Sequence, residues 1–118
     1  MQLYILIIMS IVLGACGQIA MKLGTAQIVV DGLSVTAQLL RYFSNIPILL
    51  GLALYTFSAV LWIFAIARVQ LSIAYPMVAS GYVLVVILSY LIFHEPVSIL
   101  RLLGLFIIVA GVIVIANS

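Results

Sequence analysis

Long apolar runs separated by short polar breaks dominate this chain, and the pattern predicts helices that cross a membrane. A spanning helix needs roughly 20 predominantly apolar residues. Four runs meet that requirement, at residues 3–22, 46–67, 73–93 and 98–116. Segments such as LFIIVAGVIVIA do not alternate apolar and polar positions, as strands of a membrane β-barrel would. We therefore expect an all-α integral membrane protein, with four transmembrane helices forming a single domain over residues 1–118.

The polar breaks carry helix start and stop signals. Asn45 ahead of Ile46 and Pro47 is typical of an N-cap with proline in the first turn, where the missing N–H does no harm. Pro96 in HEPVS separates the third helix from the fourth. The long connection, residues 24–45, contains SVTAQLLRYFSN, which predicts either an amphipathic helix at the membrane interface or a passive ordered loop.

The composition fits a lipid environment. Of the 118 residues, 69% are hydrophobic and 5% are charged, whereas soluble domains are nearer a quarter charged. The leading MQLY segment has no Lys or Arg, and its apolar run exceeds a typical signal-peptide core, so we expect a retained helix. Cys16, the one cysteine, lies inside this helix and predicts a small packing residue, because a single cysteine forms no disulfide framework.

Basic residues are distributed unevenly between the three connections. Lys22, Arg41 and Arg101 flank the first and third connections, while Arg68 stands alone in the second. Three basic residues against one favour a cytoplasmic location of the first and third connections, with both termini outside. So small a bias is also typical of a dual-topology protein. Four short helices enclose little volume for a pathway and show no internal repeat, so we expect two copies to supply the symmetry that many transporters use.

Acidic residues are absent from the bodies of all four predicted spans. Asp31 lies in the long connection, while His94 and Glu95 close the third helix. Ionisable groups within lipid are costly and mark functional sites, so their absence is informative. A proton-coupled exporter of cations needs a carboxylate near the midplane, and none is evident here. The pattern argues against cation exchange, although Glu95 could act near one membrane surface.

One face of the first helix changes from small to polar to cationic residues. Gly14, Gln18 and Lys22 follow at a spacing of four, with Ser10 and Gly17 close beside them. Lysine can hold a phosphate as a point charge, and the Gln18 amide can donate and accept hydrogen bonds. The alternative is that Lys22 snorkels to the membrane surface and Gln18 bonds a neighbouring helix.

Aromatic and hydroxyl side chains repeat at a spacing of seven on two helices. Tyr55 and Trp62 share a side of the second helix, with Ser58 between them. Tyr75, Tyr82 and Ser89 share a side of the third. These stripes predict a groove for an amphipathic ligand. They are also typical of aromatic packing between helices and of aromatic belts at the membrane interface.

Proline and glycine positions predict a bend and a close helix contact. Pro76 removes a hydrogen bond to the Ser72 carbonyl, and Gly81 loosens the same region, so together they predict a hinge. Gly104 and Gly111, seven apart on the fourth helix, predict a dimer interface, because small residues allow close approach in lipid. Packing of these glycines inside the monomer is the alternative.

The order of short motifs resembles a known family. GQIAMK lies in the first predicted helix, GLALYTFSAVLWIFAI in the second, SIAYPM opens the third, and HEPVS precedes the glycine-bearing fourth. This order is similar to the small subunits of the aminoarabinose-phospho-undecaprenol flippase. These are four-helix members of the drug/metabolite transporter superfamily, related to the small multidrug resistance exporters. The resemblance covers almost the whole chain, is best from Gly51 onward and is poorest in residues 24–44.

The resemblance implies four helices, dimer assembly and movement of a polyprenyl-phosphate-linked sugar across the cell inner membrane. Its expected partners are membrane lipid, that glycolipid, and a second four-helix subunit forming a homodimer or a heterodimer. No cofactor, metal or nucleic acid is expected. Glu95 would pair with an amino sugar or with Arg101. The phosphate would meet Lys22 with Arg41 or Arg68, and the sugar would meet Gln18, Tyr75, Tyr82 and Ser89.

Two alternatives to a flippase remain open. In the related drug exporters, a first-helix glutamate is essential for proton and substrate exchange, and alignment on Met21 and Lys22 puts Gly14 at that position. This departure disfavours an exporter of hydrophobic cations, which would have to use Glu95 or no proton. A membrane subunit that stabilises a larger partner without transporting anything is the other alternative. An enzyme is not expected, because no nucleophile–base pair, metal cluster or phosphate loop is evident in the sequence.

Overall fold

The structure, a computed structural model, describes residues 2–118, with side chains from Tyr4 onward, and this part folds into helices without a strand. The helices are α1 (Gln2–Ala26), α2 (Val35–Phe43), α3 (Ile46–Ile66), α4 (Leu71–Met77), α5 (Ser80–Phe93) and α6 (Ile99–Ala116). Four spans are long and apolar enough to cross a membrane: α1, α3, α4 with α5, and α6. The expected all-α fold with four membrane-crossing helices is confirmed.

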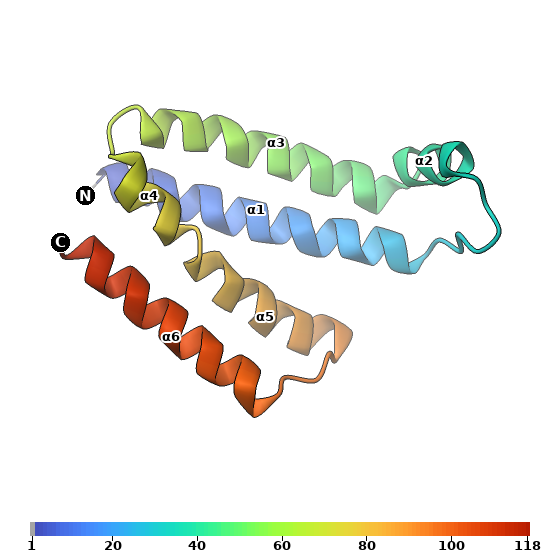
Figure 1. Cartoon of the computed structure of the whole chain (residues 1–118). Helices are drawn as coiled ribbons and strands as arrows, with labels where there is room; N and C mark the ends of the chain where they lie inside the picture. The colour runs from blue at the N-terminus through green and yellow to red at the C-terminus, as the bar shows by residue number, and fades with distance from the viewer. Residues whose placement is uncertain (1) are drawn as a thin grey trace.

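The helices form two parts, which run obliquely to each other (Figure 1). Helices α1 and α3 lie side by side and antiparallel, whereas α4, α5 and α6 form the second part below them in that view. We call one end of the molecule the α2 end, because α2 lies just beyond the C-terminus of α1. The opposite end, where α3 connects to α4 and both chain termini lie, is the terminal end.

Glycines bring α1 and α3 into backbone contact. A Cβ atom on Gly17 would lie 2.8 Å from the carbonyl oxygen of Gly51, and one on Gly51 would lie 2.6 Å from that of Gly17. Gly24 sits equally close to Asn45 and Ile48 at the α2 end. Lipid tails are as apolar as the helices, so association within a bilayer depends on close packing of this kind. These two helices therefore form the tightest unit of the fold.

A small apolar core joins this unit to α4 near the terminal end. Ile7 on α1, Ala65 on α3 and Ala74 on α4 are fully buried against one another. Trp62 and Ile11 pack against this cluster. By contrast, α6 has no buried residue. Among the described helices, α6 packs substantially only on α4 and α5. The second part is therefore attached mainly through α4 and α5.

Polar residues at the helix ends satisfy free backbone groups. The Asn45 side chain accepts a hydrogen bond from the Ile48 N–H at 3.1 Å, which confirms the predicted N-cap of α3. Ser34 and Ser98 cap α2 and α6 in the same way. Helix α5 ends at His94, which adopts the left-handed conformation with φ of 56°. That residue turns the chain toward Pro96, so HEPVS separates α5 from α6 as expected.

The third predicted span is divided rather than simply bent. Between Met77 and Ser80 the backbone forms short i→i+3 bonds, including Ala79 N–H to the Pro76 carbonyl at 3.0 Å. Pro76 precedes this tighter turn, and the bond that it cannot donate, to the Ser72 carbonyl, lies inside α4. Gly81 has a further role, because a Cβ there would lie 3.0 Å from Ile11 of α1. It is buried and allows α5 to approach α1 closely.

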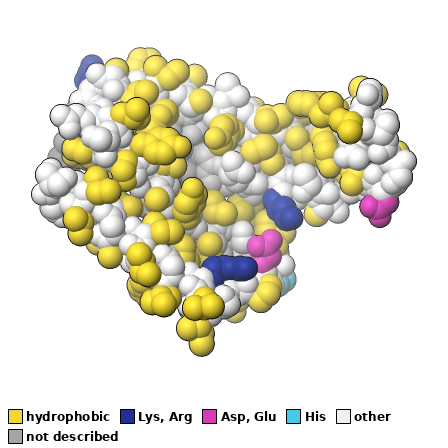
Figure 2. Space-filling model, viewed as in Figure 1, with side chains coloured by type: hydrophobic (Ala, Val, Ile, Leu, Met, Phe, Trp, Pro, Cys, Tyr) yellow, Lys and Arg dark blue, Asp and Glu magenta, His cyan; other side chains and the backbone are white. Residues whose placement is uncertain are grey.

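Hydrophobic side chains are spread over the whole visible face and charged side chains are few, as a lipid-facing protein requires (Figure 2). Cys16 is exposed on α1, so its predicted packing role is wrong for contacts inside this chain. A Cβ added at Gly104 or Gly111 on α6 would meet no atom within 4 Å. These two glycines therefore make no close helix contact within the monomer.

Candidate functional site

A polar groove of about 390 Å³ lies between α1, α3, α4 and α5. Polar and aromatic side chains form much of its wall, although the surrounding surface is almost entirely apolar. The lining residues are Ser10, Ile11, Gly14, Ala15, Gln18, Tyr55, Ser58, Ala59, Trp62, Tyr75, Val78, Gly81, Tyr82 and Val85. Because four helices contribute, the groove depends on how the two parts of the fold pack together.

The groove brings together most of the aromatic and small residues that the sequence singles out. These are Gly14, Gln18, Tyr55, Trp62, Tyr75, Gly81 and Tyr82. The two stripes meet across the groove because Tyr55 and Trp62 face α1 from α3, while Tyr75 and Tyr82 approach from α4 and α5. Ser89 is absent from this wall. Tyr82 and Ser89 share α5, so the seven-residue spacing keeps them on one side of that helix, but the groove ends at Val85, one turn before Ser89.

Two serines form the floor of the groove. The Ser10 hydroxyl donates to the Ser58 carbonyl at 2.8 Å, and the Ser58 hydroxyl donates to the Ser10 carbonyl at 2.6 Å. Both residues are buried. A Cβ on Gly14 would lie 3.3 Å from the Ser58 hydroxyl, so glycine leaves room for this arrangement. Both hydroxyl protons are used inside the protein, and a ligand could use only the remaining acceptor positions of these oxygens.

The other polar groups of the groove face its open space. Tyr55, Tyr75 and Tyr82 are about half or more exposed, at 49%, 67% and 59%. Within the described residues, neither these hydroxyls nor the Gln18 amide takes part in a hydrogen bond to the chain. The groove wall carries no acidic or basic side chain. It therefore offers neutral donors and acceptors beside aromatic rings, which suits an uncharged, hydroxyl-bearing ligand.

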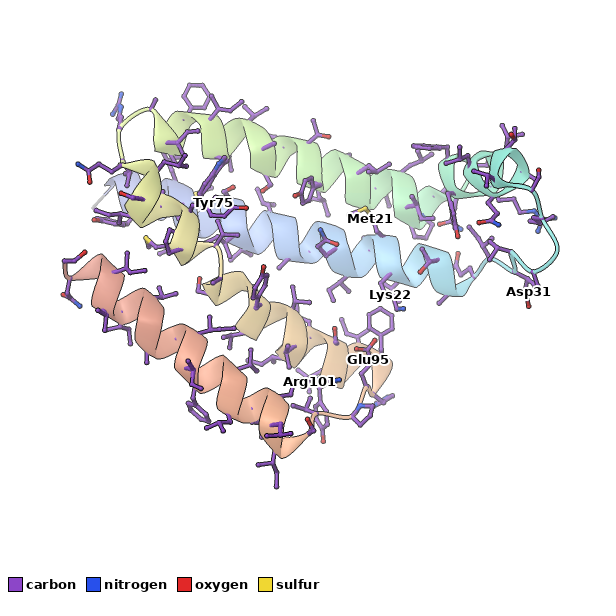
Figure 3. All side chains as sticks on the ribbon, in the orientation of Figure 1. Met21, Lys22, Asp31, Tyr75, Glu95 and Arg101 are labelled. Carbon is purple, nitrogen blue, oxygen red and sulfur yellow. The ribbon has the colours of Figure 1, made fainter. Side chains whose placement is uncertain are left out.

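Three charged side chains lie outside the groove, toward the α2 end (Figure 3). Figure 3 shows Lys22 near the end of α1, above the loop that carries Glu95, with Arg101 at the start of α6. Lys22 lies one helical turn beyond Gln18, the last α1 residue of the groove. Arg101 donates from Nη1 to the Pro96 carbonyl at 3.0 Å, which holds its side chain over the α5–α6 loop. We call Lys22, Glu95 and Arg101 the charged cluster.

The remaining basic residues lie apart from the cluster. Arg41 is exposed on α2, and Arg68 is exposed just after α3 at the terminal end. Lys22 and Arg68 therefore stand at opposite ends of the membrane-crossing helices. A single phosphate could not meet both in this structure. Pro76 lies at the α4–α5 break beside the groove, and Gly104 and Gly111 lie on α6, away from it.

A second groove, which no sequence pattern predicted, lies between α5 and α6. It has a volume of about 460 Å³. Its wall is apolar except for one tyrosine, and consists of Val83, Val86, Ile87, Tyr90, Leu91, Val97, Leu102, Leu105, Phe106 and Val109. Nothing in the sequence distinguishes these residues from ordinary lipid-facing ones, because only the splayed packing of α6 creates the space.

The reciprocal serine pair and the Gly17–Gly51 contact were also not identified as a unit from the sequence. Each partner is visible as a small residue on its own helix. Their pairing depends on the register of α1 against α3, which no local pattern specifies. The small residues on α1 and α3 are the one sequence signal that could have suggested a close contact between these helices.

Comparison with known proteins identifies full-length relatives. The chain is 34% identical over 117 residues to "Probable 4-amino-4-deoxy-L-arabinose-phosphoundecaprenol flippase subunit ArnE" of Pseudomonas aeruginosa, covering 96% of each chain. It is 30% identical to the similarly named subunit ArnF of Aeromonas hydrophila, covering 95% of this chain and 78% of the relative. It is 27% identical to an Escherichia coli ArnE, covering 99% of both.

No family model matches the sequence, and no solved structure matches it. The full-length relatives nevertheless share one description, and the multi-pass helical fold agrees with it. This chain belongs to the family of ArnE- and ArnF-type small membrane subunits of the 4-amino-4-deoxy-L-arabinose-phosphoundecaprenol flippase.

Proposed function

We propose that this chain is one subunit of a flippase that moves a polyprenyl-phosphate-linked amino sugar across the cell inner membrane. The observation that supports this proposal most directly is the 34% identity to an ArnE-named relative across 96% of both chains. The substrate named for that relative, 4-amino-4-deoxy-L-arabinose-phosphoundecaprenol, is the one proposed here. Membership of the wider drug/metabolite transporter superfamily is part of the same proposal.

The sugar would occupy the polar groove. A sugar that leaves water needs hydrogen-bond partners. Moving an unpaired amide or hydroxyl from water into hydrocarbon costs about 4–8 kcal/mol. The Gln18 amide and the hydroxyls of Tyr75 and Tyr82 can supply such partners. The rings of Tyr55 and Trp62 would cover the apolar faces of the sugar. The neutral wall supplies hydrogen bonds to the sugar but no counter-charge for its amino group.

The phosphate would lie near Lys22. This ammonium group is exposed one turn beyond the groove, so a phosphate there would leave the attached sugar within reach of Gln18. Glu95 stands at the same end and would attract the amino group of the sugar as it enters or leaves. The proposed path therefore runs between the charged cluster and the polar groove.

The partner would be a second four-helix subunit, either a sister chain or another copy of this one. The relatives are named as subunits of a flippase, which implies a partner for them. Helix α6 is the surface proposed for this contact, because Gly104 and Gly111 are open inside the monomer. Helix α2 would lie in the membrane interface, since Val35, Leu40 and Phe43 on it are strongly exposed.

Transport in proteoliposomes tests the proposed function. The chain would be reconstituted alone and together with a sister subunit, and offered a labelled polyprenyl-phosphate amino sugar. Movement of this lipid between leaflets, reduced at least about tenfold by Lys22→Ala and retained by Lys22→Arg, is the expected result. Transport that is unchanged by Lys22→Ala would contradict the phosphate role of that residue. Absence of transport in both preparations would favour a subunit that does not itself transport.

A hydrophobic cation is the second candidate substrate, favoured by one specific observation. Tyr55, Trp62, Tyr75 and Tyr82 line the same groove, and aromatic faces attract cations. The groove lacks the carboxylate that would exchange such a cation for a proton. Uptake of a labelled lipophilic cation by the same proteoliposomes, without movement of the sugar lipid, would assign the protein to the drug exporters instead.

A further inference from the structure

Helix α5 forms a wall between the two grooves. Tyr82 and Val85 line the polar groove on one side of this helix. Val83, Val86 and Tyr90 line the apolar groove on its other side. The protein therefore presents a polar surface and an apolar surface on opposite faces of one membrane-crossing helix.

Both grooves end close to the charged cluster. The polar groove ends at Gln18, one turn from Lys22. The apolar groove includes Val97 and Leu102, which bracket Arg101 in the sequence at the start of α6. Figure 3 shows Lys22, Glu95 and Arg101 around the C-terminal end of α5. A molecule that passes around this end of α5 would meet cations between a polar and an apolar surface.

We propose that the lipid tail of the substrate lies in the apolar groove between α5 and α6, with its phosphate held between Lys22 and Arg101. The attached sugar then reaches the polar groove on the other side of α5. This inference rests on the proposed flippase function and adds the location of the tail and the role of Arg101. In this arrangement α5 separates the apolar tail of the lipid from its polar sugar.

The occupant of the apolar groove follows from its surroundings. The groove lies between two membrane-crossing helices, and its wall carries no charge, so hydrocarbon from the bilayer can enter it without losing hydrogen bonds. The cations at its end select an anionic head group over a zwitterionic one. Arg101 uses one donor on Pro96 and keeps others for phosphate, since a guanidinium group carries five N–H donors.

Photo-crosslinking in transport-competent proteoliposomes tests the proposal. The probe is a polyprenyl phosphate with a diazirine in its isoprenoid chain, and the reference probe is phosphatidylethanolamine with a diazirine in its acyl chain. We expect the polyprenyl probe to label Val86, Ile87, Leu105 or Phe106 at least about fivefold more than the reference probe does. Equal labelling by the two probes, or labelling mainly on the outer faces of α1 and α3, would overturn the proposal.

Variants identify which groups are responsible. Leu105→Trp fills the apolar groove and should abolish the preferential labelling, whereas Ile63→Trp adds the same bulk on the exposed face of α3 and should preserve it. Arg101→Gln should lower labelling at subsaturating probe severalfold, and Arg101→Lys should restore part of it. If Arg101→Gln has no effect, the phosphate is not held there.

The outcomes separate this inference from the proposed function. Transport of the sugar lipid that persists in Leu105→Trp at the wild-type rate would overturn the tail site while leaving the flippase function intact. Failure of the wild-type protein to transport the sugar lipid would overturn the function itself. A second copy of the chain in the groove would be revealed by efficient disulfide formation between Phe106→Cys subunits, with protection from the polyprenyl probe, and would also overturn the tail site.

Discussion

Ser10 and Ser58 exchange hydrogen bonds across the contact between α1 and α3, each hydroxyl donating to the backbone carbonyl of the other residue at 2.8 and 2.6 Å. The two hydroxyl oxygens are 3.1 Å apart. A hydroxyl normally bonds within its own helix, as Thr56 does to the Leu52 carbonyl. Here both hydroxyls instead join two helices directly beneath the polar groove. The groove therefore has a fixed floor on α1 and α3, and any movement must come from α4 and α5.

Removing this pair should loosen the two-helix unit. We expect Ser10→Ala and Ser58→Ala each to lower the free energy of unfolding by about 1 kcal/mol, since hydrogen bonds between membrane helices are worth about 0.6–2 kcal/mol. The double variant should cost less than the sum, because the two bonds share one geometry. Unfolding of the purified protein by SDS titration measures these values. Ser80→Ala is the control, because that hydroxyl bonds only to Met77 in the adjoining turn. Full additivity would show that the two bonds act independently.

The Gly17–Gly51 contact should tolerate no added carbon. In Gly51→Ala the new Cβ would lie 2.6 Å from the Gly17 carbonyl oxygen and 2.9 Å from the Met21 nitrogen, both backbone atoms that cannot turn away. Separating the helices should cost about 1–3 kcal/mol, the usual range for overpacking. The same SDS titration measures the loss. Ala53→Val adds carbon to an exposed position of α3 and should change stability little. Equal stability of both variants would contradict the close packing.

The sequence predicted the helices better than it predicted how they meet. Apolar run length identified all four spans, because the hydrocarbon thickness sets it directly. Asn45 and Pro96 marked helix ends through local chemistry. The seven-residue spacing correctly brought Tyr75 and Tyr82 to one groove although the helix is broken between them. It failed at Ser89 because the groove ends at Val85, one turn earlier on α5. Helix register and the splay of α6 depend on distant contacts, so the serine pair and the apolar groove could not be predicted.

Gln18 should be the most sensitive polar residue of the groove on α1. Gln18→Leu keeps much of the side-chain volume but removes the amide. Loss of one or two hydrogen bonds at about 0.5–1.5 kcal/mol each predicts a transport rate lower by about 2- to 160-fold. Initial transport rates of the labelled sugar lipid in proteoliposomes measure it. Cys16→Ala, on an exposed part of α1 outside the groove, should transport normally. Normal transport by Gln18→Leu would show that the amide does not contribute to the proposed site.

Helix α6 should affect assembly rather than monomer folding. No atom lies within 4 Å of a Cβ at Gly111, so Gly111→Leu fits the monomer without a clash. If α6 forms the subunit contact, the added side chain separates the subunits, because small residues allow close approach in lipid. We expect the fraction of dimer in detergent, measured by light scattering, to fall while the helical circular dichroism signal is retained. An unchanged dimer fraction would place the interface elsewhere.

The break between α4 and α5 should determine how fast the groove opens. Pro76→Ala restores an N–H that can bond to the Ser72 carbonyl, which should stabilise the last turn of α4, just ahead of the break, by about 1–3 kcal/mol. Because Val78, Gly81 and Tyr82 line the groove around this break, a stiffer helix should raise stability and slow transport by several-fold. Hydrogen exchange of amides 77–82 should slow together with the transport rate. Pro47→Ala is the matched control, since Pro47 lies in the first turn of α3, where no helical bond is lost. Slower transport with unchanged amide exchange would show that Pro76 acts on the substrate rather than on the break.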